Sequence, residues 1–480
     1  MLSWFASPPR PANLIVASAT SSERDAHEDR FAPALRGSLT AGSNSLSLNR
    51  RIGRFLAVAG MVVTIYARYK SRQIHGRITG KGQERSWYDD VHRFAAKRVR
   101  DTAIDQQGLL VKACQFAGTR ADVLPPAFID ILSSLHDRVP PRPWTEMLPW
   151  LETQLGGPVA DVFSRFDEVP VAAASLAQVH RAQLIDGRDV AVKLQYPGID
   201  RVVATDLANF GFFVEILARL ERSFDLRLLL HEIRQYIPLE LDFEREAANA
   251  RQFASNFAGD SAVEFPVPIE ELSGPRLLVM NFIEATKISQ INELQAQGID
   301  KHQVAELLVR VYLDQILEHG FFHGDPHPGN LMVKPGPVLV ILDLGLAKQF
   351  SRELRLGLLR LTAAILARDA AAIGDSFRAL GFHTRSGSDD TLIIVAELLL
   401  GQAFDAGQAY ADAGMIDRIN DELMSALRMN PIVRASSDLM LVLRVMGLLS
   451  GLSKMLDSKV DPAQAMMPFV IKAMASASNP

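Results

Sequence analysis

The chain has 480 residues, 48% hydrophobic and 22% charged, a balance that excludes a wholly disordered protein and leaves room for two or three domains. Its single cysteine, Cys114, excludes an intrachain disulfide. The net charge of −4 divides unevenly, because residues 1–49 are neutral, residues 50–100 carry +10 and residues 101–480 carry −14. The basic segment predicts an anionic partner, and we expect a membrane surface and no nucleic acid, since the acidic remainder has no basic stripe or aromatic platform.

Residues 1–49 are rich in Ser, Ala and Pro, and we expect them to be disordered. Residues 55–67 are uncharged and predict a helix of about 20 Å, which is shorter than the ~30 Å hydrocarbon core. This helix fits either a membrane interface or a buried position against the body of the protein. No uncharged apolar run in the chain reaches the ~18–20 residues of a membrane-spanning helix, so the sequence predicts none.

The middle of the chain changes from helical to mixed character. Residues 86–155 have amphipathic helical spacing, interrupted by proline-rich breaks. Two β-prone runs, residues 189–193 and 276–280, then flank a long helical stretch at about 200–257. From residue 285 onward the pattern is mostly helical, with one predicted hairpin whose strands are residues 331–333 and 338–342.

The strongest chemical signal is the sequence FHGDPHPGN at 322–330, followed after the hairpin by ILDLG at 341–345. In a phosphotransfer site one carboxylate orients the acceptor hydroxyl, while an amide oxygen and a second carboxylate hold Mg²⁺ on the nucleotide phosphates. Asp325, Asn330 and Asp343 have the residue types and spacing for these three roles. The hairpin is expected to bring the two motifs face to face.

A second signal is Lys193, at the end of a β-branched strand where a buried ammonium needs a partner. Such a lysine can bridge nucleotide phosphates and a helix carboxylate. Its candidate partners alternate in one acidic segment: Glu240, Asp242, Glu244 and Glu246. If that segment is one helix, Asp242 and Glu246 lie one turn apart on the same face.

Two weaker signals complete the set. The segment 170–180 contains Ala172, Ala173, Ala174 and Ser175 where a kinase has a glycine-rich loop, and alanines still permit close approach of the backbone to phosphates. Upstream, Lys112 and Gln115 are three residues apart and are expected to share one helix face.

Together, and in this order, these segments resemble the UbiB/AarF family of atypical kinase-like proteins, from about Lys112 to Asp343. The resemblance aligns the family's Lys-x-Gly-Gln motif with residues 112–115, where Cys114 replaces the glycine and puts close helix packing there in doubt. It aligns the remaining family motifs with the Ala-rich loop at Ala172–Ser175, the strand lysine Lys193, the Glu-x-Asp pair Glu240 and Asp242, the helix glutamate Glu246, the catalytic-loop residues Asp325 and Asn330, and the metal-binding Asp343.

The resemblance implies an α+β, two-lobed protein-kinase-like fold with a helical N-terminal extension and a largely helical C-lobe. The expected divisions are a disordered segment at 1–49, a basic helical extension at 50–159, an N-lobe at 160–284 and a C-lobe at 285–480. In the family the extension is thought to lie over the site where a protein kinase binds its peptide. In agreement, the sequence after Asp343 passes almost directly into a helix and lacks the Ala-Pro-Glu signature of a long activation segment.

The resemblance also implies ATP or ADP with Mg²⁺ as cofactors, and an ATPase or unorthodox phosphotransferase linked to ubiquinone or other isoprenoid lipids. The expected location is cytoplasmic, with peripheral attachment to an anionic membrane, and the oligomeric state is left open. A small-molecule kinase of the aminoglycoside or choline type and a non-catalytic nucleotide-binding scaffold remain as alternatives. A metallohydrolase built on His323, Asp325, His327 and Asp343 is a further alternative from another enzyme class.

Overall fold

The computed structural model describes residues 48–80, 85–117, 124–132, 135, 140–220, 226–396, 425–426, 429–434 and 437–477. The N-terminal segment expected to be disordered therefore lies outside the described residues up to position 47. The chain forms two compact units. Among the described residues, unit 1 contains 48–247 and 267–283, and unit 2 contains 248–266 and 284–477.

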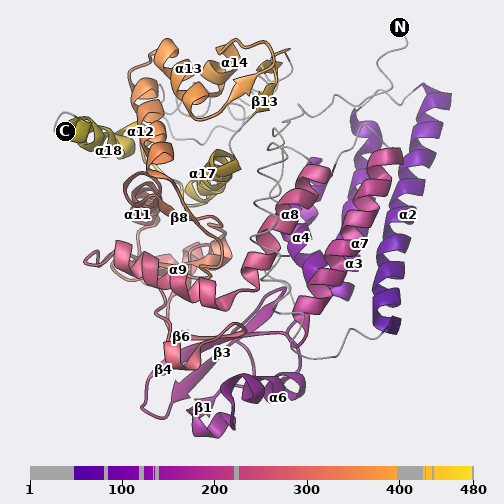
Figure 1. Ribbon diagram of the computed structural model, residues 1–480, viewed down its shortest axis with the longest axis vertical. Coiled ribbons are helices and arrows are strands. Elements are labelled where there is room, and N and C mark those ends of the chain that lie inside the picture. Colours follow the sequence, from indigo (N-terminus) through magenta and orange to yellow (C-terminus); the bar gives the residue numbers. More distant parts are fainter. Residues whose placement is uncertain are drawn as a thin grey trace, which may run out of the picture. The chain divides into compact units, whose positions relative to one another are not determined.

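The helical part of unit 1 contains the extension and two later helices (Figure 1). Its helices are α2 (Leu48–Thr79), α3 (Asp89–Gln106), α4 (Leu109–Ala117), α5 (Pro126–Leu132), α6 (Trp144–Leu155), α7 (Ile199–Leu220) and α8 (Arg227–Glu240). In Figure 1, α2 runs beside α3 and α7, and both of these helices contact it.

Helix α2 differs from the short helix that the sequence predicted, because it continues for 32 residues. Of the helices in the described part of the chain, α2 alone is long and apolar enough to cross a membrane, judged by length and composition only. One face of α2 is fixed to the protein: the Arg54 guanidinium is buried and makes a bidentate ion pair with Asp206 of α7. The Phe55 ring also stacks on Phe213 of α7 at 5.2 Å. The opposite face of α2 is exposed. One face of the helix therefore has the buried position against the protein, and the membrane interface stays a prediction.

The sheet of unit 1 has five strands in the order β1-β3-β4-β6, with β2 paired to β3. Its strands are β1 (Phe163–Phe166), β2 (Ala172–Ala173), β3 (Ala177–Leu184), β4 (Asp189–Gln195) and β6 (Leu277–Asn281). All of these pairings are antiparallel. The two strands expected around 189–193 and 276–280 are confirmed and pair directly, with Lys193 opposite Leu278. Lys193 therefore lies on a central strand, flanked by Val179 on the other side.

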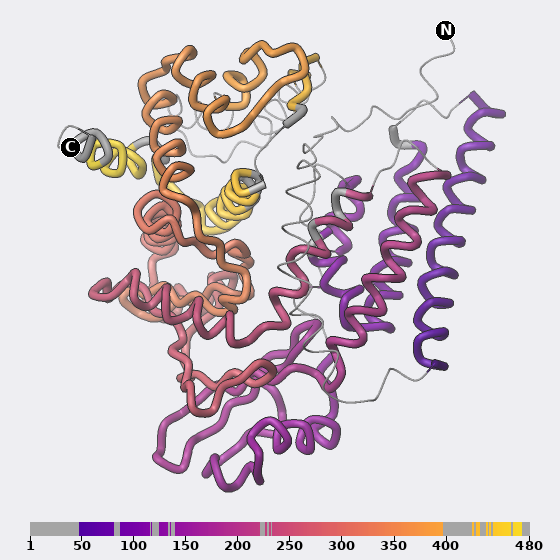
Figure 2. Tube along the Cα trace, viewed as in Figure 1, coloured from indigo at the N-terminus to yellow at the C-terminus, as the bar shows by residue number. Residues whose placement is uncertain are grey.

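Unit 2 is mostly helical and begins within α9 (Phe243–Asn256), the helix that crosses the boundary between the units. Figure 2 traces its helices from the described start of unit 2 to the C-terminal segment. The other helices are α10 (Ile291–Ala296), α11 (Lys301–Leu313), α12 (Arg352–Leu366), α13 (Ala370–Ala379), α14 (Asp390–Ala396), α17 (Ser437–Met455) and α18 (Pro462–Ala477). A π-helical turn, η5 (Asp314–His319), extends α11. The core of unit 2 is formed around α11, with Val304, Leu308 and Val311 buried.

The strands of unit 2 correct the expectation of a single hairpin. That hairpin is present, because β9 (Leu331–Lys334) and β10 (Val338–Ile341) pair antiparallel. It lies within a four-stranded sheet in the order β5-β10-β9-β7, where β5 is Val263–Glu264 and β7 is Thr286–Lys287. Two further pairs form: β8 (Phe321–His323) with β11 (Ala347–Gln349), and β12 (His383–Thr384) with β13 (Ile432–Arg434). These strands have two to four residues, too few to show a periodic pattern in the sequence.

Candidate active site

In unit 1, Lys193 is paired with Glu246. The Lys193 ammonium lies 2.6 Å from Oε1 and 2.8 Å from Oε2 of Glu246, and both side chains are almost fully buried. The ammonium also lies 5.2 Å from the centre of the Phe243 ring, within the range of a cation–π contact. A buried lysine needs a counter-charge to stay ionised, and the first turn of α9 supplies it.

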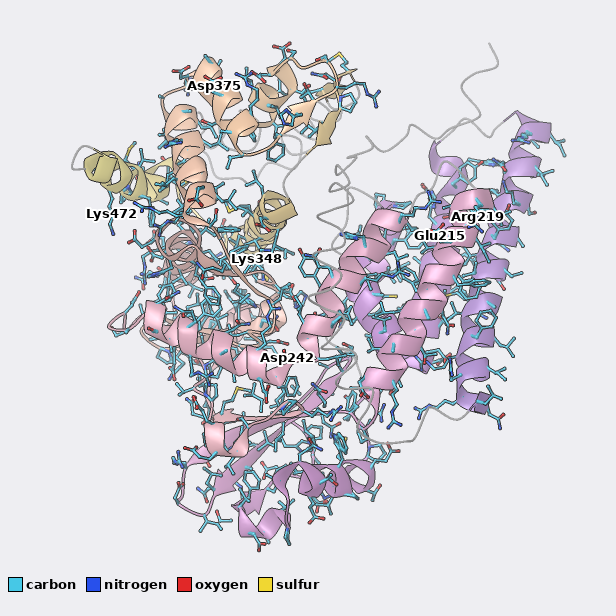
Figure 3. The ribbon with its side chains drawn as sticks, viewed as in Figure 1. Glu215, Arg219, Asp242, Lys348, Asp375 and Lys472 are labelled. Atoms are coloured by element: carbon cyan, nitrogen blue, oxygen red, sulfur yellow. The ribbon has the colours of Figure 1, made fainter. Side chains whose placement is uncertain are left out.

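The acidic segment is not one helix, which corrects one expectation. Helix α8 ends at Glu240, and α9 begins at Phe243. Asp242 lies at the break, at the start of α9, where Figure 3 labels it. Its carboxylate accepts a hydrogen bond from the Arg245 amide (3.0 Å), and its carbonyl accepts one from the Glu246 amide (3.1 Å). Asp242 thus orients the helix that carries Glu246, as an N-terminal cap does.

Lys112 ties the extension to α8. Its ammonium lies 2.8 Å from Glu240 Oε1, and both side chains are 19% exposed. Gln115 does not join this contact as the shared-face expectation implied. Its amide is buried and donates to the Leu135 carbonyl at 2.9 Å. The residue between them, Cys114, is buried in the core of unit 1, and this burial raises the pKa of its thiol to about 12. The cysteine is therefore accommodated by packing, and its thiol stays protonated at neutral pH.

The Ala-rich segment forms a tight hairpin. Ala172 and Ala173 form β2, paired with Val179 and Gln178 of β3. The Ala174 amide donates to the Ala177 carbonyl at 2.8 Å and closes the turn. Ser175 inside this turn is buried. Ala172, whose side chain is a single methyl group, is exposed.

Three residues that sequence reasoning did not assign to the site hold this hairpin in place. Tyr196, directly after β4, donates its hydroxyl to the Ala174 carbonyl at 3.1 Å. The Arg142 amide donates to Gln178 Oε1 at 3.0 Å, so the proline-rich break of the extension is bound to β3. His180 shares a 2.8 Å contact with the Gln178 amide nitrogen, and burial lowers its pKa. The contacts of Tyr196 and Arg142 join segments that are distant in sequence, so no local spacing signals them, whereas Gln178 and His180 are two residues apart on β3.

In unit 2, the residues of the catalytic-loop motif form a compact turn. The Asn330 side-chain amide donates to the Asp325 carbonyl at 3.2 Å, and the His327 amide donates to the same oxygen at 2.7 Å. The loop follows β8, whose partner β11 brings the Gly324 amide to the Leu346 carbonyl at 2.8 Å. A Cβ at Gly324 would lie 3.1 Å from the Leu346 side chain, so the close approach favours glycine.

The hairpin places Asn330 and Asp343 at the same end of the β9–β10 pair. Leu331 pairs with Ile341, and the Leu342 amide donates to the Asn330 carbonyl at 2.8 Å. Asp343, the next residue, is exposed and has a φ of 52°, in the left-handed region that L-residues rarely adopt. The buried side chain of Asn249, on α9, donates to the Leu344 carbonyl at 2.8 Å and supports the turn.

His323 is fully buried, which decides against the metallohydrolase alternative. Its Nδ1 lies 3.0 Å from the Tyr312 hydroxyl, and its Nε2 lies 3.1 Å from the Asp343 carbonyl oxygen. Both ring nitrogens are therefore engaged within the protein and neither faces a metal. Burial lowers the pKa of His323, although the charges of Asp325 and Asp343 oppose this effect. Among the described residues, no group of three or more His, Cys, Asp or Glu side chains is placed to hold a metal ion.

The predicted residues thus fall into two sets. Lys112, Glu240, Lys193, Glu246 and the Ala-rich hairpin belong to unit 1, and Asp325, Asn330 and Asp343 belong to unit 2. The contacts above pair Lys112 with Glu240 and Lys193 with Glu246 in unit 1. In unit 2 they join Asp325, Asn330 and the backbone next to Asp343.

Comparisons with known proteins bear on the family and the fold. Residues 134–377 match the family described as the ABC1 atypical kinase-like domain. The chain is 33% identical to AarF domain-containing protein kinase 1 of Xenopus tropicalis, over 67% of this chain and 62% of that protein. It is 30% identical to the chloroplastic Protein ACTIVITY OF BC1 COMPLEX KINASE 8 of Arabidopsis thaliana, over 80% of this chain and 54% of that protein.

The chain therefore spans between half and two thirds of the length of these relatives. A solved structure with a similar fold is that of Rv3197 from Mycobacterium tuberculosis in complex with erythromycin. It has a TM-score of 0.55 and 22% identity and covers 78% of this chain and 95% of that chain, a likeness that shows the fold alone. The fold is α+β and kinase-like, with a helical N-terminal region. The chain belongs to the UbiB/AarF family, whose members carry the ABC1 atypical kinase-like domain.

Proposed function

We propose that this protein binds ATP or ADP with Mg²⁺ and acts as an ATPase or an unorthodox phosphotransferase. The buried ion pair between Lys193 and Glu246 carries the proposal. In protein kinases a strand lysine paired with a helix glutamate holds the nucleotide phosphates, and the pair must be formed for activity. Burying both charges costs free energy, so a purely structural role would be served as well by two apolar side chains.

The Ala-rich hairpin supports the same nucleotide. The proposed contacts are Lys193 with the phosphates and the backbone of Ala172 to Ser175 with the phosphate chain. The tight turn at Ala174 and the exposed position of Ala172 suit such a contact. Tyr196 and Gln178 act as supports of the hairpin rather than as ligands.

The proposed metal ligands are Asn330 and Asp343. The side-chain nitrogen of Asn330 donates to the Asp325 carbonyl, so the side-chain oxygen of Asn330 is the atom left to bind a metal. Asp343 supplies an exposed carboxylate. Carboxylate and amide oxygens are the ligands that Mg²⁺ prefers, so these residues fit that ion. When bound, Mg²⁺ would neutralise charge on the phosphates.

Asp325 is the proposed base. It would take up the proton of the attacking hydroxyl or water while the terminal phosphoryl group leaves ADP. With water as the acceptor the protein would be an ATPase, and with a lipid it would be a phosphotransferase. With another small molecule as the acceptor it would be the alternative, a small-molecule kinase. A non-catalytic scaffold would bind nucleotide without turnover.

The ion pair of Lys112 with Glu240 supports a restricted acceptor site. It fixes α4 of the extension to α8, the helix that ends just before Asp242 and the start of α9. We therefore propose that the ion pair of Lys112 and Glu240 keeps the extension closed and disfavours phosphorylation of peptides in trans, while Gln115 supports α4 through Leu135 and Asp242 caps α9.

The exposed face of α2 supports peripheral attachment to an anionic membrane. Its large apolar side chains are exposed and recur at helical spacing: Ile52, Leu56, Val63, Ile74 and Ile78. Arg50, Arg51 and Arg77 flank them and are exposed. An apolar stripe flanked by basic residues is typical of a helix that lies in a membrane interface. We propose that the protein lies on the cytoplasmic side of such a membrane and functions in the metabolism of ubiquinone or other isoprenoid lipids.

The test is release of phosphate from radiolabelled ATP by the full chain, compared with Asp325→Asn. We expect slow Mg²⁺-dependent turnover in the wild type and at least a hundredfold loss in the variant, because general-base catalysis contributes about 10²–10⁴-fold. Binding of ADP should be retained in the variant. Binding without turnover in the wild type would favour the scaffold instead.

A further inference from the structure

Two buried polar side chains of unit 2 have no place in the proposed chemistry. Tyr312 is in the last turn of α11, and Gln315 is in the π-helical turn η5 that follows. Both are essentially inaccessible to solvent, at 1% and 0% exposure. Both contact His323, because Gln315 Oε1 accepts from the His323 amide at 2.9 Å and the Tyr312 hydroxyl lies 3.0 Å from His323 Nδ1. Single π-helical turns inside helices are frequent at functional sites.

The chemistry of the partners fixes the direction of these hydrogen bonds. The Asp343 carbonyl oxygen can only accept, so His323 Nε2 must carry a proton and donate to it. In a neutral imidazole, Nδ1 is then an acceptor, and the Tyr312 hydroxyl must donate to it. The chain therefore runs in one direction, from Tyr312 through His323 to the backbone of Asp343.

We propose that Tyr312 is a positioning residue that acts through His323 to hold Asp343 in its left-handed backbone conformation. The inference rests on the proposed function for the role of Asp343 as a metal ligand, but the hydrogen-bond chain can be tested without nucleotide. Without the hydroxyl of Tyr312, Nδ1 of His323 becomes a buried acceptor with no donor, whereas Nε2 still donates to the Asp343 carbonyl. The ring is then held on one side only, and the hydrogen bond that supports the backbone of Asp343 is weakened.

Two observations make this more than packing. Asp343 has a φ of 52° and is not a glycine, so its Cβ makes this backbone conformation unfavourable. The conformation therefore needs support from the surrounding structure. Gln315 Nε2 is buried and makes no hydrogen bond to the described residues, although Oε1 is used. A buried amide nitrogen without a hydrogen bond costs free energy. We infer that Gln315 is kept at this position because its Oε1 accepts from the His323 amide and fixes the backbone there.

The variant that isolates the hydroxyl is Tyr312→Phe, and the chain contains a matched control. Tyr69 donates to or accepts from His92 Nδ1 in the extension, in a second, partly buried Tyr–His contact that is remote in sequence from the site. Tyr69→Phe therefore removes an equivalent hydrogen bond without touching His323. In full-length protein labelled with ¹⁵N-histidine, the signals of His323 are assigned by their loss in His323→Gln.

The first measurement uses no nucleotide. We expect wild-type His323 to show a protonated Nε2 and a hydrogen-bonded, unprotonated Nδ1. In Tyr312→Phe the Nδ1 resonance should move to that of an unprotonated nitrogen without a hydrogen bond, and the Nε2–H signal should shift as its bond to Asp343 weakens, whereas Tyr69→Phe should leave His323 unchanged. Identical His323 signals in Tyr312→Phe and wild type would overturn the inference.

The second measurement is the Mg²⁺ concentration that gives half of the ADP-induced rise in melting temperature. We expect it to increase about tenfold in Tyr312→Phe and to stay unchanged in Tyr69→Phe, with no change in ADP binding when Mg²⁺ is absent. An unchanged Mg²⁺ requirement in Tyr312→Phe would overturn the positioning role. If the wild type does not respond to ADP and Mg²⁺, the proposed function fails and the ¹⁵N comparison alone decides the inference.

Discussion

The ammonium of Lys193 on β4 lies within 2.8 Å of both carboxylate oxygens of Glu246 on α9, and the two side chains are 11% and 5% exposed. The pair joins the central strand of the unit 1 sheet to the first turn of the helix that leads into unit 2. Its geometry depends on the break after Glu240, because α9 starts in a new direction at the cap formed by Asp242.

Neutralising one member of this ion pair should lower the free energy of unfolding more than replacing both members by apolar residues. Glu246→Gln leaves the Lys193 ammonium buried without a counter-charge, and we expect a loss of about 3–5 kcal/mol in the free energy of unfolding of unit 1. The double variant Lys193→Met, Glu246→Leu should recover much of that loss and bind no nucleotide. Urea unfolding of wild type, Glu246→Gln and the double variant measures this, and a double variant that is less stable than Glu246→Gln would contradict it.

Low pH should destabilise unit 1 through His180. Its Nδ1 donates to the Asp167 carbonyl at 2.8 Å and its Nε2 accepts from Gln178, so the folded state needs the neutral ring. Burial lowers its pKa below the ordinary value of about 6.5. The stabilisation is therefore present above pH 6.5 and is lost as the pH falls through that value, since the unfolded chain then binds the extra proton.

His180→Phe tests this directly. The phenyl ring preserves stacking beside Trp144 and Phe166, whose centres lie 5.4 and 5.2 Å from the imidazole. We expect lower stability than wild type at pH 7.5 but a smaller further loss between pH 7.5 and 5.5. An equal loss in both proteins would assign the pH dependence to other groups.

Much of the candidate site could be predicted, because its residues are close in sequence or belong to one regular element. Asp325 and Asn330 share one turn, and the β9–β10 register that places Asp343 beside them follows from two short apolar runs around a Pro-Gly turn. The strand position of Lys193 follows from its β-branched neighbours.

Other features could not be predicted, because they depend on contacts between distant segments. The spacing of Lys112 and Gln115 gave them one helix face, but Leu135 captures the glutamine amide. The length of α2 exceeded the apolar run because Arg54, which appeared to end it, is buried against Asp206. The contact of Tyr196 with the Ala174 carbonyl and that of Tyr312 with the His323 ring likewise depend on atoms brought near by folding.

Releasing the extension should change acceptor use. Lys112→Ala removes the ion pair with Glu240, and we expect autophosphorylation or phosphorylation of a basic test peptide to increase above that of wild type. Lys97→Ala, which removes an exposed lysine of α3, is the control for charge and should behave as wild type. The assay follows transfer of label from ATP to protein and peptide. Vigorous peptide phosphorylation by the wild type would show that the extension does not restrict access.

Membrane attachment should depend on the exposed face of α2. Leu56→Glu with Val63→Glu places two charges on that face, whereas Val169→Glu with Ile185→Glu places them on apolar residues that are equally exposed elsewhere in unit 1. We expect only the first pair to reduce flotation with acidic liposomes, and flotation of wild type to weaken with salt because each basic residue near the surface contributes about 1 kcal/mol.

Point substitutions are preferable here to a deletion of residues 1–72, because the deletion also removes Arg54 and leaves Asp206 buried without its partner. Equal flotation of both double variants, unaffected by salt, would point to another attachment site or to a protein receptor.

The most direct test of the account is calorimetric titration of ADP into the full-length protein with Mg²⁺ and with excess chelator, for wild type and for Asp343→Asn. The account predicts saturable binding of one nucleotide in the presence of Mg²⁺. It also predicts at least tenfold weaker binding with chelator, and binding by Asp343→Asn that is weak under both conditions because the carboxylate of the metal ligand is gone. The same affinity with and without Mg²⁺ in both proteins, or no binding of nucleotide by the wild type, would contradict it.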